Sequence, residues 1–165
     1  MKIWFYGDQN GINTDMLFPG KYTYTCATAD EIRPHLLEDL DPLFTKDVMP
    51  GDLIFAGTNF GCGSSREQPV LGLKAVGVAA VIAKSFARIF YRAAVNQGLL
   101  LIESADAVNA YKSGDAVTFN PDEGVISIAS KTFTFPTLPK EITAIKDAGG
   151  LLAYTKATLE KKKRG

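Results

Sequence analysis

The chain has 165 residues, with 18 basic and 18 acidic side chains, one histidine and two cysteines. Its length is that of one domain, residues 1–165, and a hydrophobic fraction of 46% allows a packed core. The balanced charge gives no reason to expect a nucleic-acid or acidic-membrane partner. A zinc site needs about four ligands, mostly Cys or His, so Cys26, His35 and Cys62 are too few and too scattered to bind a metal without another chain.

The N-terminal residues 1–7 are too short and too quickly interrupted by polar residues for a signal peptide. No apolar run approaches the ~20 residues that a membrane-spanning helix needs. The two cysteines lack the pattern of a disulfide framework. We therefore expect a protein of the reducing cytoplasm.

The N-terminal third is predicted to contain little regular structure. Residues 2–6 favour a short strand, which runs into a loop rich in Gly, Asn and Asp over residues 7–15. Residues 19–29 show no periodicity and predict a long loop. Asp30 is then expected to cap a short helix over residues 31–38.

The middle of the chain alternates apolar strands with helices. The predicted strands are residues 52–56, 78–83 and 99–102, and the predicted helices are residues 66–76 and 86–97, the second ended by Gly98. This order predicts an α/β fold with a parallel core and helices packed on it.

The C-terminal third changes character. Short strands at residues 115–119, 125–129 and 132–135 are separated by turn residues and predict an antiparallel appendage. A final helix is expected to begin near Lys140 and to break at Gly149 and Gly150.

A glycine-rich loop at residues 57–63 leads to Ser64, Ser65 and Arg66. The segment is no Walker A loop, because it has no lysine, and Arg66 stands where a dinucleotide fingerprint needs its third glycine. Cys62 occupies the place of the serine in a nucleophile elbow. What remains is a loop that brings two serines and an arginine to the start of a helix, where an anion or a serine alkoxide would be stabilised.

The alternative is a purely structural role, in which this segment only caps the helix, since S-x-x-E, here Ser64 to Glu67, is a common capping box. Pro69 separates the two serines, because a proline belongs in the first helical turn, where its missing N–H costs nothing. That position favours Ser65 as the cap, with Gln68 completing an S-x-x-Q box. Ser64 is then left free for chemistry.

Three blocks together resemble a known family. They are N-F-G-C-G-S-S-R-E-Q at residues 59–68, A-K-S-F-A-R-I-F-Y-R at 83–92 with N-Q-G-L at 96–99, and N-T-D-x3-P-G-K-Y at 13–22. The sequence resembles the aconitase swivelling-domain family, and within it the small subunits of isopropylmalate dehydratases. The resemblance spans about residues 1–135 and implies a three-layer swivelling β/β/α domain with a parallel core and the antiparallel C-terminal β appendage.

The resemblance also implies a function. In that family a serine of this loop removes a proton beside a carboxylate, which would be Ser64 here, while Ser65 would help to orient the substrate and Arg66 would bind a carboxylate. The substrates are hydroxy di- or tricarboxylates, and a 4Fe-4S cluster in the large subunit acts on the hydroxyl that leaves. The chain would thus be one half of a hydro-lyase, without a cofactor of its own and inactive without its large subunit.

The segment that would select the substrate reads Tyr22-Thr23-Tyr24-Thr25. The homoaconitase-like version of this family carries an arginine here, and its absence argues against a tricarboxylate, whose third charge would go unpaired. Thr23, Tyr24 and Thr25 are the predicted substrate contacts, with Tyr24 able to pack on an alkyl branch. Isopropylmalate is favoured. A related hydro-lyase of the citramalate/citraconate, dimethylmalate or homoaconitate type, a non-catalytic anion- or RNA-binding module, and self-association of the isolated chain stay open.

Overall fold

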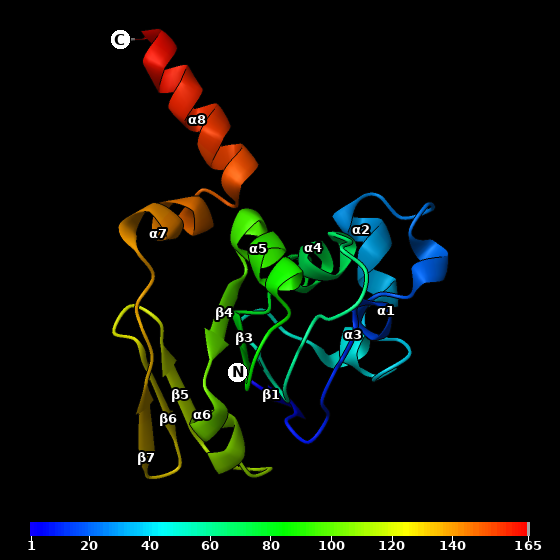
Figure 1. Cartoon of the computed structure of the whole chain (residues 1–165), viewed down its shortest axis with the longest axis vertical. Helices are drawn as coiled ribbons and strands as arrows, with labels where there is room; N and C mark the ends of the chain where they lie inside the picture. The colour runs from blue at the N-terminus through cyan, green and yellow to red at the C-terminus, as the bar shows by residue number, and fades with distance from the viewer. Residues whose placement is uncertain (165) are drawn as a thin grey trace.

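The structure, a computed structural model that describes residues 1–164, is built on a parallel sheet of four short strands (Figure 1). The strands lie in the order β1 (Ile3–Tyr6), β2 (Leu53–Ala56), β3 (Ala80–Ala83) and β4 (Leu100–Glu103). All residues of β2 and β3 are buried, as expected for inner strands covered on both faces. The parallel core predicted from the apolar runs is confirmed.

One face of this sheet is covered by helices. Helices α2 (Ala29–Ile32), α4 (Gln68–Ala75) and α5 (Arg88–Gln97) contribute Ile32, Leu73 and Phe90 to a core that includes Ile54 and Val81 of the sheet. Helix α5 ends at Gly98, which adopts the left-handed conformation with φ +76°, as the sequence predicted.

The other face is covered by the antiparallel appendage. Strands β5 (Val117–Asn120), β6 (Val125–Ile128) and β7 (Lys131–Thr134) form this second sheet. Its Ile126 and Ile128, together with Val108 of helix α6 (Ala105–Ala110), pack against Phe55 and Ile82 in a second core. The three predicted layers are therefore helices, parallel sheet and antiparallel sheet, seen side by side in Figure 1.

The N-terminal third contains more short helices than the sequence predicted. These are α1 (Thr14–Leu17), the 3₁₀ helices η1 (Gly20–Tyr22) and η2 (Arg33–His35), and α3 (Phe44–Asp47). Each lasts for about one turn, too short for hydrophobic periodicity to show in the sequence.

The helix expected over residues 31–38 with Asp30 as its cap was wrong in both respects. Thr28 is the cap, because its hydroxyl accepts from the N–H of Glu31 while the Glu31 carboxylate accepts from the Thr28 N–H. Helix α2 passes directly into the 3₁₀ helix η2 at Arg33. Pro34 lies in η2 and has no N–H to continue an α-helix.

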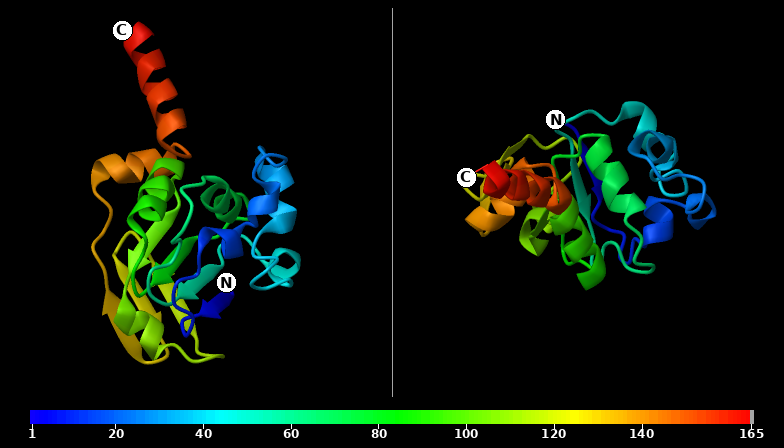
Figure 2. Two further views of the ribbon diagram at one scale, coloured as in Figure 1. Left: turned by 45° about the vertical axis from the view of Figure 1, so that its right-hand side comes forward. Right: turned by 90° about the horizontal axis from the view of Figure 1, so that it is seen from above.

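Two helices close the chain, α7 (Lys140–Asp147) and α8 (Leu151–Arg164), with the predicted break at Gly149 and Gly150. Lys74 Nζ donates to the carbonyl oxygens of Gln97 and Gly149, so it joins α4 to the end of α5 and to this break. Helix α8 projects away from the body (Figures 1 and 2). Within residues 1–164, no helix has the length and apolar character to cross a membrane.

Candidate functional site

The glycine-rich loop follows β2 at the carboxyl edge of the parallel sheet and is held from two sides by backbone hydrogen bonds. On the N-terminal side the N–H groups of Gly11 and Thr14 donate to carbonyl oxygens of the loop, and the Gly61 N–H donates to the Ile12 oxygen, all at 2.8 Å. On the other side Phe60 donates to the Ser85 carbonyl at 3.0 Å. Residues 57–62 therefore form a fixed platform rather than a free loop.

Two glycines let the chain turn at the end of this platform. Gly61 has φ +76°, and a Cβ at this position would collide with the Phe90 ring of α5. Gly63 has φ +97°, and a Cβ there would lie 3.2 Å from Thr14 Oγ1. The chain is thereby directed outward at Ser64.

Ser64 and Ser65 are both exposed, and in the described part of the chain neither hydroxyl has a hydrogen-bond partner. The prediction that Ser65 caps the helix is wrong. Helix α4 begins only at Gln68, with Glu67 as its N-cap and no side-chain cap bond, because the Arg66 N–H closes a turn onto the Ser64 carbonyl at 2.9 Å first. Pro69 does lie in the first helical turn, as predicted, but both serines are free of a capping role.

Arg66 is the anchored member of the segment. Its side chain is only 11% exposed; Nη2 lies 2.7 Å from Asp15 Oδ1, and Nη1 donates to Thr23 Oγ1 at 3.0 Å. Its Nε is buried and has no partner among the residues described. A guanidinium carries about five N–H donors, so each terminal nitrogen keeps one hydrogen that Asp15 and Thr23 do not use, whereas Nε is covered by the chain itself.

The segment that the sequence proposed for substrate selection lies beside Arg66 only in part. Thr23 contacts Arg66 through its hydroxyl, and its carbonyl accepts from Gln68 Nε2 at 3.2 Å. Thr25 Oγ1 turns back to the Tyr22 carbonyl at 3.3 Å, and Tyr24 is 99% exposed. Thr23 thus joins the site in the isolated chain, whereas Tyr24 faces outward and Thr25 supports its own turn.

Sequence reasoning missed Asp15 as the partner of Arg66. Asp15 lies 51 positions away in the sequence, and its only signal was its place in the N-T-D block at residues 13–15. No local pattern pairs two such distant residues, whereas the backbone bonds between residues 11–14 and the platform bring them together.

The chain matches the family model "Aconitase C-terminal domain" over residues 26–107. It is 45% identical to the 3-isopropylmalate dehydratase small subunit of Heliobacterium modesticaldum over 157 residues, which cover 94% of this chain and 93% of that one. The chain belongs to the family of 3-isopropylmalate dehydratase small subunits. The corresponding subunit of Nautilia profundicola is 43% identical over 98% of this chain and 96% of its own length.

A solved structure extends the similarity to three dimensions. The crystal structure of 3-isopropylmalate dehydratase from Methanocaldococcus jannaschii matches 99% of this chain and 97% of its own, with a TM-score of 0.85 and 41% identity. Membership in the dehydratase small-subunit family and the α/β fold with two sheets, both expected from the sequence, are thus confirmed.

The described side chains offer no set of ligands for a metal ion or an iron–sulfur cluster. Within residues 1–164, no group of three or more His, Cys, Asp and Glu side chains is arranged to hold a metal ion. Cys26 is buried, and Cys62 Sγ donates to the Gly11 carbonyl at 3.4 Å, so the two thiols serve separate packing roles.

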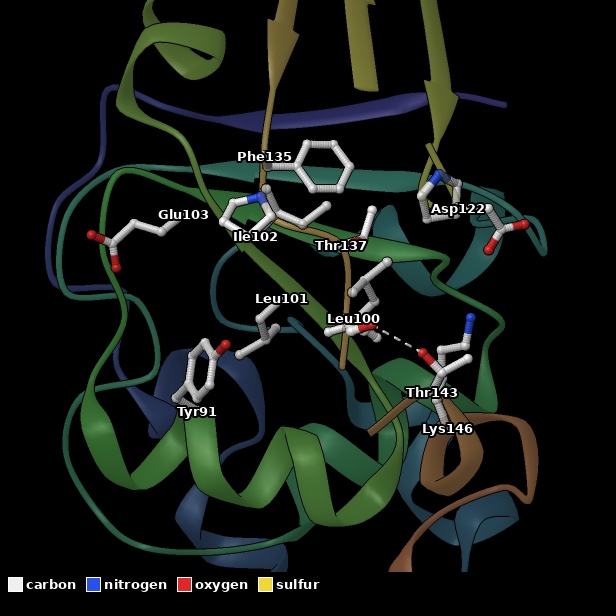
Figure 3. A pocket seen from close by; sticks show the side chains of 13 residues that line it. Tyr91, Leu100, Leu101, Ile102, Glu103, Asp122, Phe135, Thr137, Thr143 and Lys146 are labelled. Atoms are coloured by element: carbon white, nitrogen blue, oxygen red, sulfur yellow. Dashed lines mark hydrogen bonds between the residues drawn. The ribbon is translucent and has the colours of Figure 1, made fainter. Parts of the chain in front are cut away.

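A large cavity of this dehydratase small-subunit fold lies elsewhere in the molecule. It has a volume of about 500 Å³ and is bounded by β4, α5, α7 and residues 135–138, with Thr143 Oγ1 donating to the Leu138 carbonyl at its wall (Figure 3). Its lining includes no residue of the platform or of the serine segment. Ser64 and Ser65 thus stand on open surface rather than inside this cavity.

Proposed function

We propose that this chain is the small subunit of a heteromeric hydro-lyase that interconverts 2-isopropylmalate and 3-isopropylmalate in leucine biosynthesis. The observation that carries the proposal is the juxtaposition at the end of the platform. An exposed serine without a capping role, Ser64, stands two residues from Arg66, whose guanidinium is fixed by Asp15 and Thr23 and keeps free donors. The relatives reported above are named 3-isopropylmalate dehydratase small subunits, which supports the proposal.

Ser64 would act as the base. As an alkoxide, its Oγ takes the proton from the carbon beside a substrate carboxylate; the C–H electrons form the double bond, and the hydroxyl leaves from the neighbouring carbon. Rehydration with the hydroxyl on the other carbon returns the proton from Ser64 and gives the isomer. The Arg66 charge favours the alkoxide form.

Arg66 would bind a carboxylate of the substrate. The remaining hydrogens of Nη1 and Nη2 can form a two-point contact with a carboxylate, and the bonds to Asp15 and Thr23 fix the plane of the fork beforehand. Ser65, next to Ser64 and equally exposed, is placed to donate a further hydrogen bond to the bound diacid.

The substrate segment favours a diacid with an apolar branch. Residues 22–25 contain no basic side chain for a third carboxylate, and Tyr24 presents a ring with nothing packed over it. Thr23 would contribute to substrate binding by orienting Arg66. Tyr24 and Thr25 would contact the apolar branch of the substrate in the complete enzyme. Citramalate and dimethylmalate are the competing substrates, because both are diacids with smaller branches.

The partner would be the large subunit, seated over the exposed serine segment. We expect that subunit to hold a 4Fe-4S cluster, which supplies Lewis-acid chemistry at the leaving hydroxyl. The whole chain would act as one domain in this assembly, in the cytoplasm, where a reducing environment suits two free cysteines.

The test combines this chain with the cluster-loaded large subunit of the same organism. The pair is expected to dehydrate 2-isopropylmalate, seen as absorbance of the unsaturated diacid, with a higher kcat/KM than for citramalate or dimethylmalate. Ser64→Ala should lower kcat by about 10²–10⁴-fold. The control Ser113→Ala, in an exposed turn far along the chain, should match the wild type. A preference for citramalate, or full activity of Ser64→Ala, would contradict the proposal.

A further inference from the structure

His35, the only histidine of the chain, lies against Tyr22. Tyr22 directly precedes Thr23, whose hydroxyl accepts a hydrogen bond from Arg66. The His35 ring stacks on the Tyr22 ring, with 3.7 Å between centroids and 23° between planes. We propose that His35, although it does not contact the catalytic serine, is a positioning residue that sets substrate affinity by fixing the Tyr22 segment and through it Arg66. The proposal rests on the proposed function and names the residue that adjusts that same site.

His35 is itself held by charged neighbours. Its Nδ1 lies 3.0 Å from Glu38 Oε2, and the other oxygen of Glu38 lies 2.8 Å from Lys21 Nζ. Lys21 also lies over the Tyr22 ring, 4.8 Å from its centroid. His35 of η2 and Lys21 therefore both lie against the Tyr22 ring, and Glu38 binds both of them. Lys21, Tyr22, His35 and Glu38 are called the His35 cluster below.

The charge of Glu38 strengthens the contacts within the His35 cluster. The hydrogen bond from Lys21, helped by that from His35, holds the pKa of the Glu38 carboxyl below its usual range. Glu38 is thus ionised at neutral pH and accepts from both neighbours at once. An ionised acceptor forms the stronger hydrogen bonds, so the His35 ring has one preferred orientation.

The fixed Tyr22 ring determines the backbone that follows it. The Tyr22 carbonyl accepts from the N–H groups of Thr25 and Cys26, at 3.1 and 3.0 Å, which closes the turn that contains Thr23. Thr23 Oγ1 is in turn the acceptor for Arg66 Nη1. A loose Tyr22 would therefore release one of the two contacts that orient the guanidinium.

This arrangement predicts a specific kinetic signature. Arg66 binds a carboxylate that the substrate keeps throughout the reaction, so a misplaced fork weakens ground state and transition state alike and raises KM. The proton transfer at Ser64 does not pass through the His35 cluster, so kcat should change little. A residue with only a structural role would lower the unfolding temperature without this division.

Three substitutions separate the ring from its hydrogen bond. His35→Phe keeps the stack and loses the contact to Glu38; His35→Asn keeps a nitrogen near Nδ1 and loses the stack; His35→Ala loses both. In the reconstituted enzyme we expect KM for 2-isopropylmalate to rise about tenfold in His35→Ala and about threefold in each of the others, with kcat within about twofold. The matched control is Arg33→Ala, an exposed residue of the same η2 turn, which should leave KM unchanged.

A second readout needs no large subunit. In the full chain alone, the Arg66 Nε–H resonance should exchange faster with water in His35→Ala, and to a smaller extent in His35→Asn and His35→Phe, than in the wild type or Arg33→Ala, because the buried Nε loses its fixed surroundings. Unchanged exchange in folded His35 variants, or unchanged KM in them, overturns the inference. If His35→Ala does not fold, the Phe and Asn variants decide. A wild-type pair inactive toward 2-isopropylmalate contradicts the proposed function instead, while the exchange measurement still tests the positioning role.

Discussion

The two halves of the segment after β2 differ in how they are held. Residues 57–62 form backbone hydrogen bonds to the N-terminal segment and to the start of α5, whereas residues 63–65 are exposed and have few contacts. Arg66 then returns to the body through Asp15 and Thr23. The difference is that a fixed scaffold presents a short exposed segment at a defined place, the arrangement expected where a rigid element carries a functional group.

The largest expected effect is a loss of stability in the scaffold half. Gly61→Ala should lower the free energy of unfolding by about 2–4 kcal/mol, because it adds left-handed strain and a Cβ that collides with the Phe90 ring. Urea denaturation measures the change. Gly114→Ala is the matched control, since Gly114 has φ +93° with open space around it, and should cost only about 1 kcal/mol. Equal effects would mean that the contact with α5 is not tight.

The next effect concerns Arg66, which anchors the end of the exposed segment. Arg66→Lys keeps the charge but loses the planar fork, so KM for 2-isopropylmalate should rise about 10- to 100-fold while the unfolding temperature changes little. Steady-state kinetics of the reconstituted enzyme give the value. Arg92→Lys, on the exposed surface of α5, serves as the control. An unchanged KM would show that Arg66 binds no substrate carboxylate.

The smallest effect is expected at the opposite end of β2, where acid should weaken the fold. Asp52 is 1% exposed and accepts from the backbone N–H groups of Lys2 and Met49 and from Trp4 Nε1. Burial alone would raise the pKa of this carboxyl, but these donors outweigh it and lower the pKa below the usual value. The unfolded chain therefore binds the proton more readily, and this stabilisation is present above about pH 4 and lost as the pH falls further.

Urea titrations between about pH 6 and pH 3 check this prediction. The stability difference between wild type and Asp52→Asn should be largest near neutral pH and should shrink on acidification. A difference that stays constant with pH would mean that Asp52 titrates alike in both states.

Much of the fold could be predicted because its signals are local. A few adjacent residues are enough to predict the apolar strands β2 and β3, the end of α5 at Gly98 and the break at Gly149. The one-turn helices α1 and α3 could not be predicted, since four residues carry no period. Thr28 was missed as a cap because Asp30 is an equally good capping residue by type, and only geometry separates them.

Within the candidate site, the sequence predicted the residues of the motif but not the residues that contact them from elsewhere in the chain. Ser64, Ser65 and Arg66 follow from the glycine-rich loop and the family resemblance, but Ser65 was assigned a cap that the Arg66 turn prevents. Neither Asp15 nor His35 could be connected to Arg66 from the sequence, because both links depend on how the N-terminal segment folds back over the platform.

The central claim is that Ser64 removes the substrate proton and has no part in folding. Proton exchange measures this directly: the reconstituted enzyme in D₂O should place deuterium on the carbon beside the carboxylate of 2-isopropylmalate, as followed by NMR. For Ser64→Ala we predict exchange at background level together with a urea unfolding curve within about 0.5 kcal/mol of the wild type. Exchange at the wild-type rate in Ser64→Ala would contradict the account.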